Sequence, residues 1–190
     1  MIINCKKGEE LMLNLSKPKI SFKTIVWKSI WYGFIAGMIS GMVKIGWENI
    51  LPPRTLARNA TNPPQHLLEQ FGMSSKAVHA FVYYSTDQKV YFVALIIHFA
   101  FSIVFAALFI FLAQYWKKTT LWQGAAYGIV IWIAFHIIIM PAMGTVPAPW
   151  NQPFDEHFSE FFGHIVWAWS IYAVAVCLAK NEKKNKLENL

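Results

Sequence analysis

Charged side chains are scarce in this sequence, since Asp, Glu, Lys and Arg together make up 14% of its 190 residues. An average soluble domain carries about 25%, so a water-soluble globular fold is disfavoured. Cysteine is limited to two residues, which argues against a disulfide-rich secreted module. Phosphate-binding glycine loops, Gly-x-Ser-x-Gly elbows and His-Glu-x-x-His motifs are also missing. Hydrophobic residues instead reach 56% and aromatic residues 16%, a composition that indicates a membrane protein rather than a disordered chain.

The basic residues lie mostly at the chain ends and in one short loop. The net charge is +7, and 12 of the 17 Lys and Arg residues fall within residues 6–28, at 117–118 or within 180–186. Basic stretches beside apolar runs follow the positive-inside pattern of membrane proteins. We therefore expect the lipid bilayer, and not nucleic acid, to be the partner of these charges.

Apolar runs predict an all-α, multi-span membrane protein with a four-helix transmembrane bundle. A helix needs about 20 apolar residues to cross the hydrocarbon core. We expect spans at about residues 25–50, 90–115, 121–143 and 157–179. They form one transmembrane domain, residues 25–179, between a cytoplasmic segment, 1–24, and a cytoplasmic Lys-rich tail, 180–190.

Loop charges set the expected orientation. Lys117 and Lys118 form a short basic loop, whereas residues 144–158 contain no Lys or Arg, so the first should be cytoplasmic and the second external. Both termini are then cytoplasmic, in a multi-pass membrane protein. Residues 1–24 lack the apolar core of a signal peptide. Cys5 and Cys177 fall on the reducing side, so we expect no disulfide.

The long outer loop, residues 51–89, begins and continues with proline pairs that interrupt helices. After Gly72, Ser74 or Ser75 is placed to cap a short helix that extends to Tyr84. Its apolar and aromatic residues fit a helix on the outer membrane surface, and equally a helix packed on the bundle.

Six of the ionisable side chains inside the expected spans form one polar layer, and each is costly there unless it is paired or hydrated. At 1.5 Å per residue, four of them lie roughly 10–12 Å below the outer boundary and the two carboxylates about one turn nearer to it. Within single helices, a Lys/Glu pair and a Glu/His pair are each spaced four residues apart, which permits contact. This polar layer consists of Lys44, Glu48, His98, His136, Glu160 and His164.

Three interpretations of the polar layer remain open. Histidine titrates near neutral pH, so the layer can respond to external acid or pass protons or a small ion. Three histidines and a carboxylate also suit zinc or iron, with ligands among His98, His136, Glu160 and His164, although the ammonium of Lys44 opposes a cation there. Haem held by two histidines is a further option, so the cofactor is open. In the third interpretation these groups only fix helix register.

A stripe of small residues lies on the first helix. Gly33, Gly37 and Gly41 are spaced four apart and allow a second helix to approach closely. The stripe predicts a helix-packing seam, and it is also compatible with a homo-oligomer or with a scaffold subunit.

These residues occur in stretches that are similar to a known family. The stretches are Gly33–Glu48 followed by Pro52-Pro53-Arg54, His98–Phe105, Leu121–Gly124, Met140–Gly144 and Ser159–Ser170. Together they make the chain, over about residues 30–172, resemble the YagU-like family of bacterial inner-membrane proteins. The resemblance implies a small multi-span protein without agreed catalytic residues and with one functional association, acid tolerance. It favours a non-enzymatic role, with an intramembrane metal enzyme as the rival.

Overall fold

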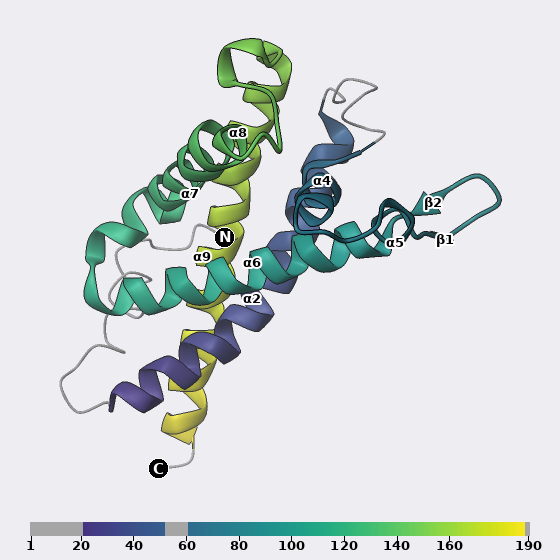
Figure 1. Cartoon of the computed structure of the whole chain (residues 1–190). Helices are drawn as coiled ribbons and strands as arrows, with labels where there is room; N and C mark the ends of the chain where they lie inside the picture. Colours follow the sequence, from purple (N-terminus) through teal and green to yellow (C-terminus); the bar gives the residue numbers. More distant parts are fainter. Residues whose placement is uncertain (1–20, 52–60, 189–190) are drawn as a thin grey trace.

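The computed structural model of the chain describes residues 21–51 and 61–188. Expectations for residues 1–20, Cys5 among them, and for Pro52 and Pro53 lie outside these ranges. The described residues form an all-α bundle with one small hairpin (Figure 1). Its long helices are α2 (Phe22–Ile50), α6 (Phe92–Tyr115) and α9 (Phe154–Glu188). A fourth rod joins α7 (Ala125–Trp132), a π-helical segment (Ile133–Ile139) and α8 (Met140–Ala142).

Three helical stretches of the described residues are long and apolar enough to cross a membrane. They are Phe92–Tyr115, Lys117–Ala142 and Phe154–Asn185. Helix α2 is not among them, although its 29 residues exceed the length of a span. Lys28, Lys44 and Glu48 lower its apolar character. Its ends match the expected range: Ser21 caps the first turn by accepting from the Thr24 amide, and Ile50 is its last residue.

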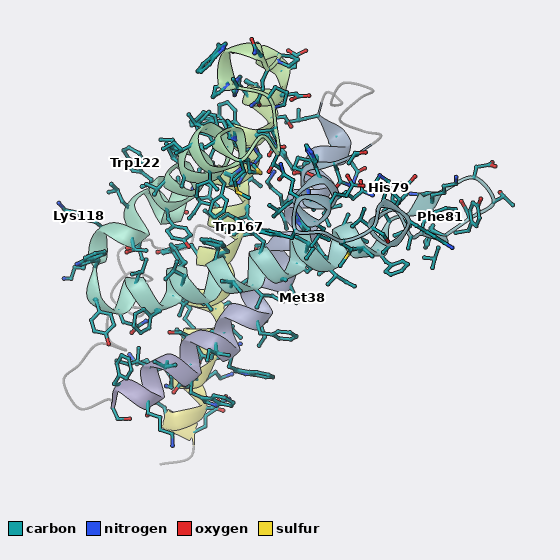
Figure 2. The ribbon with its side chains drawn as sticks, viewed as in Figure 1. Met38, His79, Phe81, Lys118, Trp122 and Trp167 are labelled. Carbon is teal, nitrogen blue, oxygen red and sulfur yellow. The ribbon has the colours of Figure 1, made fainter. Side chains whose placement is uncertain are left out.

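Helix α2 lies between α6 and α9 and contacts both along its length (Figure 1). The glycine stripe makes this possible, since a Cβ on Gly33 or Gly37 would collide with the backbone of Ala107 or Ile103 on α6. Gly41 faces the ring of Phe99 on the same helix. In the described chain the stripe is thus a seam within one molecule. Trp167 lies near the centre of the bundle (Figure 2).

The rod that contains α7 starts later than the sequence predicts. Trp122, Gln123 and Gly124 have φ values of 52°, 59° and 91°, so the chain turns through three left-handed residues before α7 begins at Ala125. Helix α7 therefore begins four residues after the expected start at about residue 121. Farther along, the Met140 amide donates to the Phe135 carbonyl, a π-helical spacing. Such segments often accompany functional sites because they redirect side chains.

The outer loop contains two short helices and a β-hairpin. Asn62 and Gln65 form a capping box at the start of α4 (Pro63–Gln70). Two side chains of α4 hold the turn after α8: Gln70 Nε2 donates to the Met143 carbonyl at 2.8 Å, and His66 Nδ1 donates to the Thr145 carbonyl at 2.9 Å.

The expected outer helix is largely replaced by the hairpin. Ser74 does cap a helix, α5 (Ser75–Val78), but it ends after four residues. Strand β1 (Val82–Tyr83) then pairs antiparallel with β2 (Lys89–Val90). The aromatic and β-branched residues before Ser85 favour a strand over a helix, and the polar residues 85–88 supply the turn. The prediction of a helix extending to Tyr84 is therefore wrong.

Candidate functional site: a buried lysine–carboxylate–histidine cluster

Lys44 reaches from α2 into the contact with α9. Its side chain is buried, and its ammonium donates to Glu48 Oε1 one turn along α2 and to Glu160 Oε2 on α9 at 2.9 Å. Gly163 provides the space, because a Cβ there would lie 3.1 Å from Lys44 Nζ. Two carboxylates thus share one buried ammonium, which lowers the cost of placing these charges in an apolar bundle.

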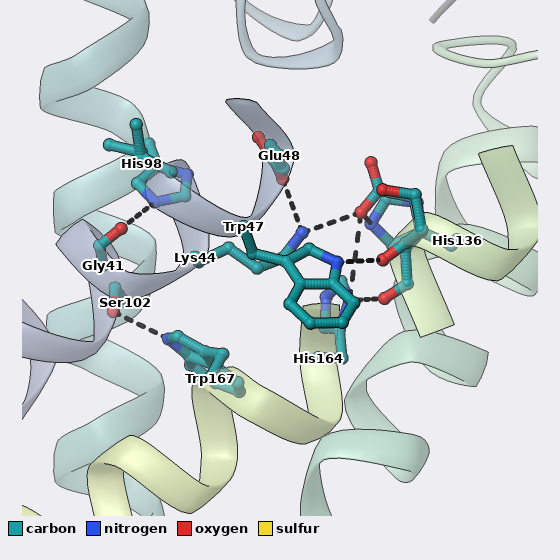
Figure 3. Close-up of polar contacts among 12 residues, drawn as sticks. Gly41, Lys44, Trp47, Glu48, His98, Ser102, His136, His164 and Trp167 are labelled. Carbon is teal, nitrogen blue, oxygen red and sulfur yellow. Dashed lines mark hydrogen bonds and ion pairs between the residues drawn. The ribbon is translucent and has the colours of Figure 1, made fainter. Parts of the chain in front are cut away.

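Glu160 is the centre of the site. Its Oε2 atom faces Lys44 Nζ at 2.9 Å, His136 Nε2 at 3.5 Å and His164 Nδ1 at 3.9 Å. These groups come from α2, from the π-helical segment and from α9 (Figure 3). The carboxylate is 6% exposed and Lys44 is 5% exposed. We define the buried cluster as Lys44, Glu48, His136, Glu160 and His164.

The two histidines of the buried cluster have different partners. His164 Nδ1 donates to the backbone carbonyl of Glu160 at 2.7 Å, which fixes the proton of a neutral ring on Nδ1. The four-residue spacing permits a contact with the Glu160 side chain as well, and the carboxylate Oε2 atom lies 3.9 Å from the same nitrogen. His136 meets His164 edge to face, with ring centroids 4.9 Å apart, and points its Nε2 atom at Glu160.

His98 is the member of the predicted polar layer that the structure places apart. Its Nε2 atom donates to the Gly41 carbonyl at 3.1 Å. Figure 3 shows it on the side of α2 away from His136. It projects from α6, which packs on the glycine face of α2, whereas Glu160 lies on α9. It lies level with Gly41 on α2, and its direction does not bring it to Glu160.

Hydrogen bonds on both sides of the buried cluster hold its helices in register. Trp47 Nε1 donates to the Ser159 carbonyl at 3.0 Å and so joins α2 to α9. Deeper in the bundle, Trp167 Nε1 donates to Ser102 Oγ at 2.8 Å, and Ser102 Oγ donates to the Gly37 carbonyl at 2.7 Å. Trp47, Ser102 and Trp167 were not among the predicted site residues. The signal that points to them in the sequence is their spacing of three or four residues from Lys44, His98 and His164 on the same helices.

Three members of the buried cluster also have the composition of a metal site. His136, Glu160 and His164 offer ligand atoms that all lie within 4.8 Å of one another. Two imidazoles and a carboxylate suit zinc. Lys44 Nζ, however, lies 2.9 Å from the carboxylate oxygen, so a cation would have to displace an ammonium. The ammonium therefore opposes the binding of a metal cation at this oxygen atom.

Comparison with known proteins places these features in a family. A family model described as "Protein of unknown function (DUF1440)" matches residues 38–173. The chain belongs to the DUF1440 family. It is also 35% identical over 162 residues to "Inner membrane protein YagU" of Escherichia coli (strain K12), which covers 73% of this chain and 78% of that protein. No solved structure matches the chain.

Family membership and the three apolar helices together identify this DUF1440 protein as an all-α membrane protein. The resemblance to the YagU-like family is thereby confirmed. The family match includes every residue of the buried cluster, whereas Gly33 and Gly37 precede it.

Proposed function

We propose that this protein is a four-span protein of the bacterial inner membrane that contributes to acid tolerance, and that its buried cluster is the group that responds to protons. The role is non-enzymatic. The relative from Escherichia coli is named as an inner-membrane protein, which supports the location. The single observation that carries the proposal is the sharing of one buried carboxylate oxygen, Glu160 Oε2, between an ammonium and a titratable imidazole.

In this proposal α2 crosses the membrane in addition to the three apolar helical stretches, and both termini are cytoplasmic. Lys44 and Glu48 are paired, so they oppose insertion less than isolated charges would. The start of α2 and the end of α9 are adjacent, since Lys28 and Tyr32 both bind the Glu182 carboxylate. This contact supports the same side for both ends.

Orientation is testable through Cys177, an exposed thiol on α9. We expect an impermeant maleimide to leave Cys177 unmodified in intact spheroplasts and to modify it after permeabilisation. Cys5 is changed to serine so that the signal comes from one position. Modification of Cys177 in intact spheroplasts would reverse the orientation.

The proton response follows from the charges that face Glu160. Among the described residues, the buried cluster holds the carboxyl groups of Glu48 and Glu160, the ammonium of Lys44 and the two imidazoles of His136 and His164. A proton taken up by His136 creates a second cation 3.5 Å from Glu160 Oε2. Because imidazoles titrate in the range that external acid reaches, the charge balance changes under acid stress.

The consequence is a change in the contact between α2 and α9. Protonated His136 competes with Lys44 for the same oxygen atom, while Glu48 remains available to hold the ammonium. Lys44 then binds Glu48 alone, so its contact between α2 and α9 is weakened, while the Trp47 hydrogen bond and the contacts of Lys28 and Tyr32 with Glu182 remain. In this way acid outside the cell alters helix packing inside the membrane.

Acid survival of a deletion strain tests the proposal. Glu160→Gln and His136→Gln, expressed from a plasmid, should fail to restore survival, because each removes one side of the competition. Glu182→Gln is the matched control, since it removes a carboxylate from the same helix at its opposite end, and it should restore survival. Membrane abundance is measured for each variant. Full protection by Glu160→Gln and His136→Gln at normal abundance would contradict the proposal.

Metal binding is the second candidate, and the grouping of His136, Glu160 and His164 favours it. The metal content of the detergent-purified protein separates the two. The proton proposal predicts that the purified protein contains less than one equivalent of zinc or iron per chain. It also predicts the same metal content in the His164→Ala variant. One equivalent that is lost in both His136→Ala and His164→Ala would replace the proton proposal with a metal centre.

A further inference from the structure

The β-hairpin of the outer loop projects away from the helical body. It precedes α6 directly, with Tyr91 between β2 and the first helical residue, Phe92. Figure 1 shows it at the edge of the molecule, beyond the end of α6. In Figure 2, Phe81 on this side and Lys118 on the other mark opposite ends of the same helix.

One face of the hairpin is an ordered aromatic surface. Phe81 packs edge to face on Tyr83, with ring centroids 5.3 Å apart, and at 6.0 Å on Tyr91. The ammonium of Lys89, the partner of Tyr83 in the ladder, lies 4.5 Å from the centre of the Phe81 ring. We define the aromatic face as Phe81, Tyr83, Lys89 and Tyr91.

This hairpin is too small to be stable in water by itself. Each strand has two residues, and an isolated two-stranded hairpin is at best marginal. Tyr83 is 61% exposed and Tyr84 is 81% exposed, so the protein body covers little of its apolar surface. Contact with an additional surface would therefore add to its stability.

The position of the hairpin indicates which surface this is. Helix α6 is one of the apolar stretches that can cross a membrane, so the residues immediately before it lie at a membrane boundary. Tyrosine is enriched at that depth, because its ring enters the apolar region and its hydroxyl stays with the headgroups. Lysine can extend its ammonium towards the phosphates from the same depth.

We propose that the aromatic face lies in the headgroup layer of the membrane and anchors the first turn of α6 there. The lipid is the partner, and the hairpin holds one end of α6 at the membrane surface. Under the orientation proposed above this is the outer leaflet, but the contact itself does not depend on the acid response. An experiment that disproves this membrane contact would therefore not bear on the proposed role of the buried cluster.

Site-directed spin labelling tests the contact. The protein, with Cys5→Ser and Cys177→Ser, is placed in nanodiscs of phosphatidylethanolamine and phosphatidylglycerol. Tyr83→Cys is labelled with a nitroxide, and its collision rates with oxygen, which concentrates in lipid, and with a nickel chelate, which stays in water, are compared. Gln88→Cys on the opposite face is the matched aqueous control, and Ile96→Cys on the exposed side of α6 is the lipid reference.

We expect the oxygen-to-nickel ratio at position 83 to lie between those at positions 88 and 96 and clearly above the former. Phe81→Cys, on the same face, should agree and guards against a local disturbance by one label. Equal ratios at 83, 81 and 88 would place the hairpin in water and overturn the proposal. Low collision rates with both reagents, accompanied by spin–spin broadening between copies, would assign the face to a second protein molecule and also overturn it.

Discussion

Replacing Lys44 with methionine tests the energetic role of the buried cluster. Methionine is one atom shorter than lysine, stays unbranched and carries no charge, so the substitution leaves Glu48 and Glu160 without their shared ammonium. At the 2.9 Å separation of Nζ and Glu160 Oε2, and an effective dielectric constant of about 20, Coulomb's law gives an attraction of about 6 kcal/mol. Desolvation offsets part of this, and removing one partner of a buried pair costs about 3–5 kcal/mol.

The assay is reversible unfolding in mixed detergent micelles, and the loss of the helical circular dichroism signal measures it. Lys44→Met should lower the free energy of unfolding by about 3–5 kcal/mol. Lys28→Met is the matched control on the same helix, because its ion pair with Glu182 is partly exposed at the bundle end. Removing such a pair should cost no more than about 1 kcal/mol.

A double-mutant cycle identifies the source of the loss. Adding Glu160→Gln to Lys44→Met removes one of the two carboxylates that have lost their ammonium. The double variant should therefore be more stable than the sum of the single effects predicts. The coupling should be about 1–3 kcal/mol, as for residues in direct contact. Strict additivity, or a Lys44→Met variant as stable as Lys28→Met, would refute the reasoning.

Further predictions concern the packing seam and the turn before α7. Gly37→Leu should separate α2 from α6 and cost at least about 1–3 kcal/mol by overpacking, whereas Gly46→Leu, which faces open space, should be tolerated; equal losses in unfolding experiments would show that the seam is not the cause. Gln123 has a φ of 59°, so Gln123→Gly should raise stability by about 1 kcal/mol and Gln123→Val should lower it; the opposite order would contradict the left-handed turn. Trp169→Phe removes the hydrogen bond to the Trp122 carbonyl and should cost about 1 kcal/mol without changing acid survival, and a loss of survival would show that the far side of α9 takes part.

Helix positions were largely predictable, because apolar run length and breaker residues determine them. The end of α2 before the proline pair and the extent of α6 agree with the expected spans. The turn at Trp122 and Gln123 was not predictable, since neither residue favours a left-handed conformation. The hairpin was missed because a capping serine, Ser74, is a stronger local signal than two-residue strands.

Which groups meet in the cluster was predictable only in part. The four-residue spacing of Lys44 and Glu48 predicts their contact, and the structure has it. Depth along the span placed His98 and His136 at one level, yet depth carries no information about the neighbouring helix that each side chain faces. His136 reaches Glu160 from a π-helical segment, and no single-helix pattern in the sequence reveals that segment.

Proton uptake by the purified protein tests the central claim most directly. Nanodiscs in weak buffer are acidified from about pH 7 to about pH 5, the range in which imidazoles titrate, and the bound protons are counted with a pH indicator. Wild-type protein should take up about one proton per chain more than the His136→Gln, His164→Gln double variant. The same difference should disappear when Glu160→Gln is compared with its own histidine double variant. Equal uptake by wild type and the double variant would contradict the account.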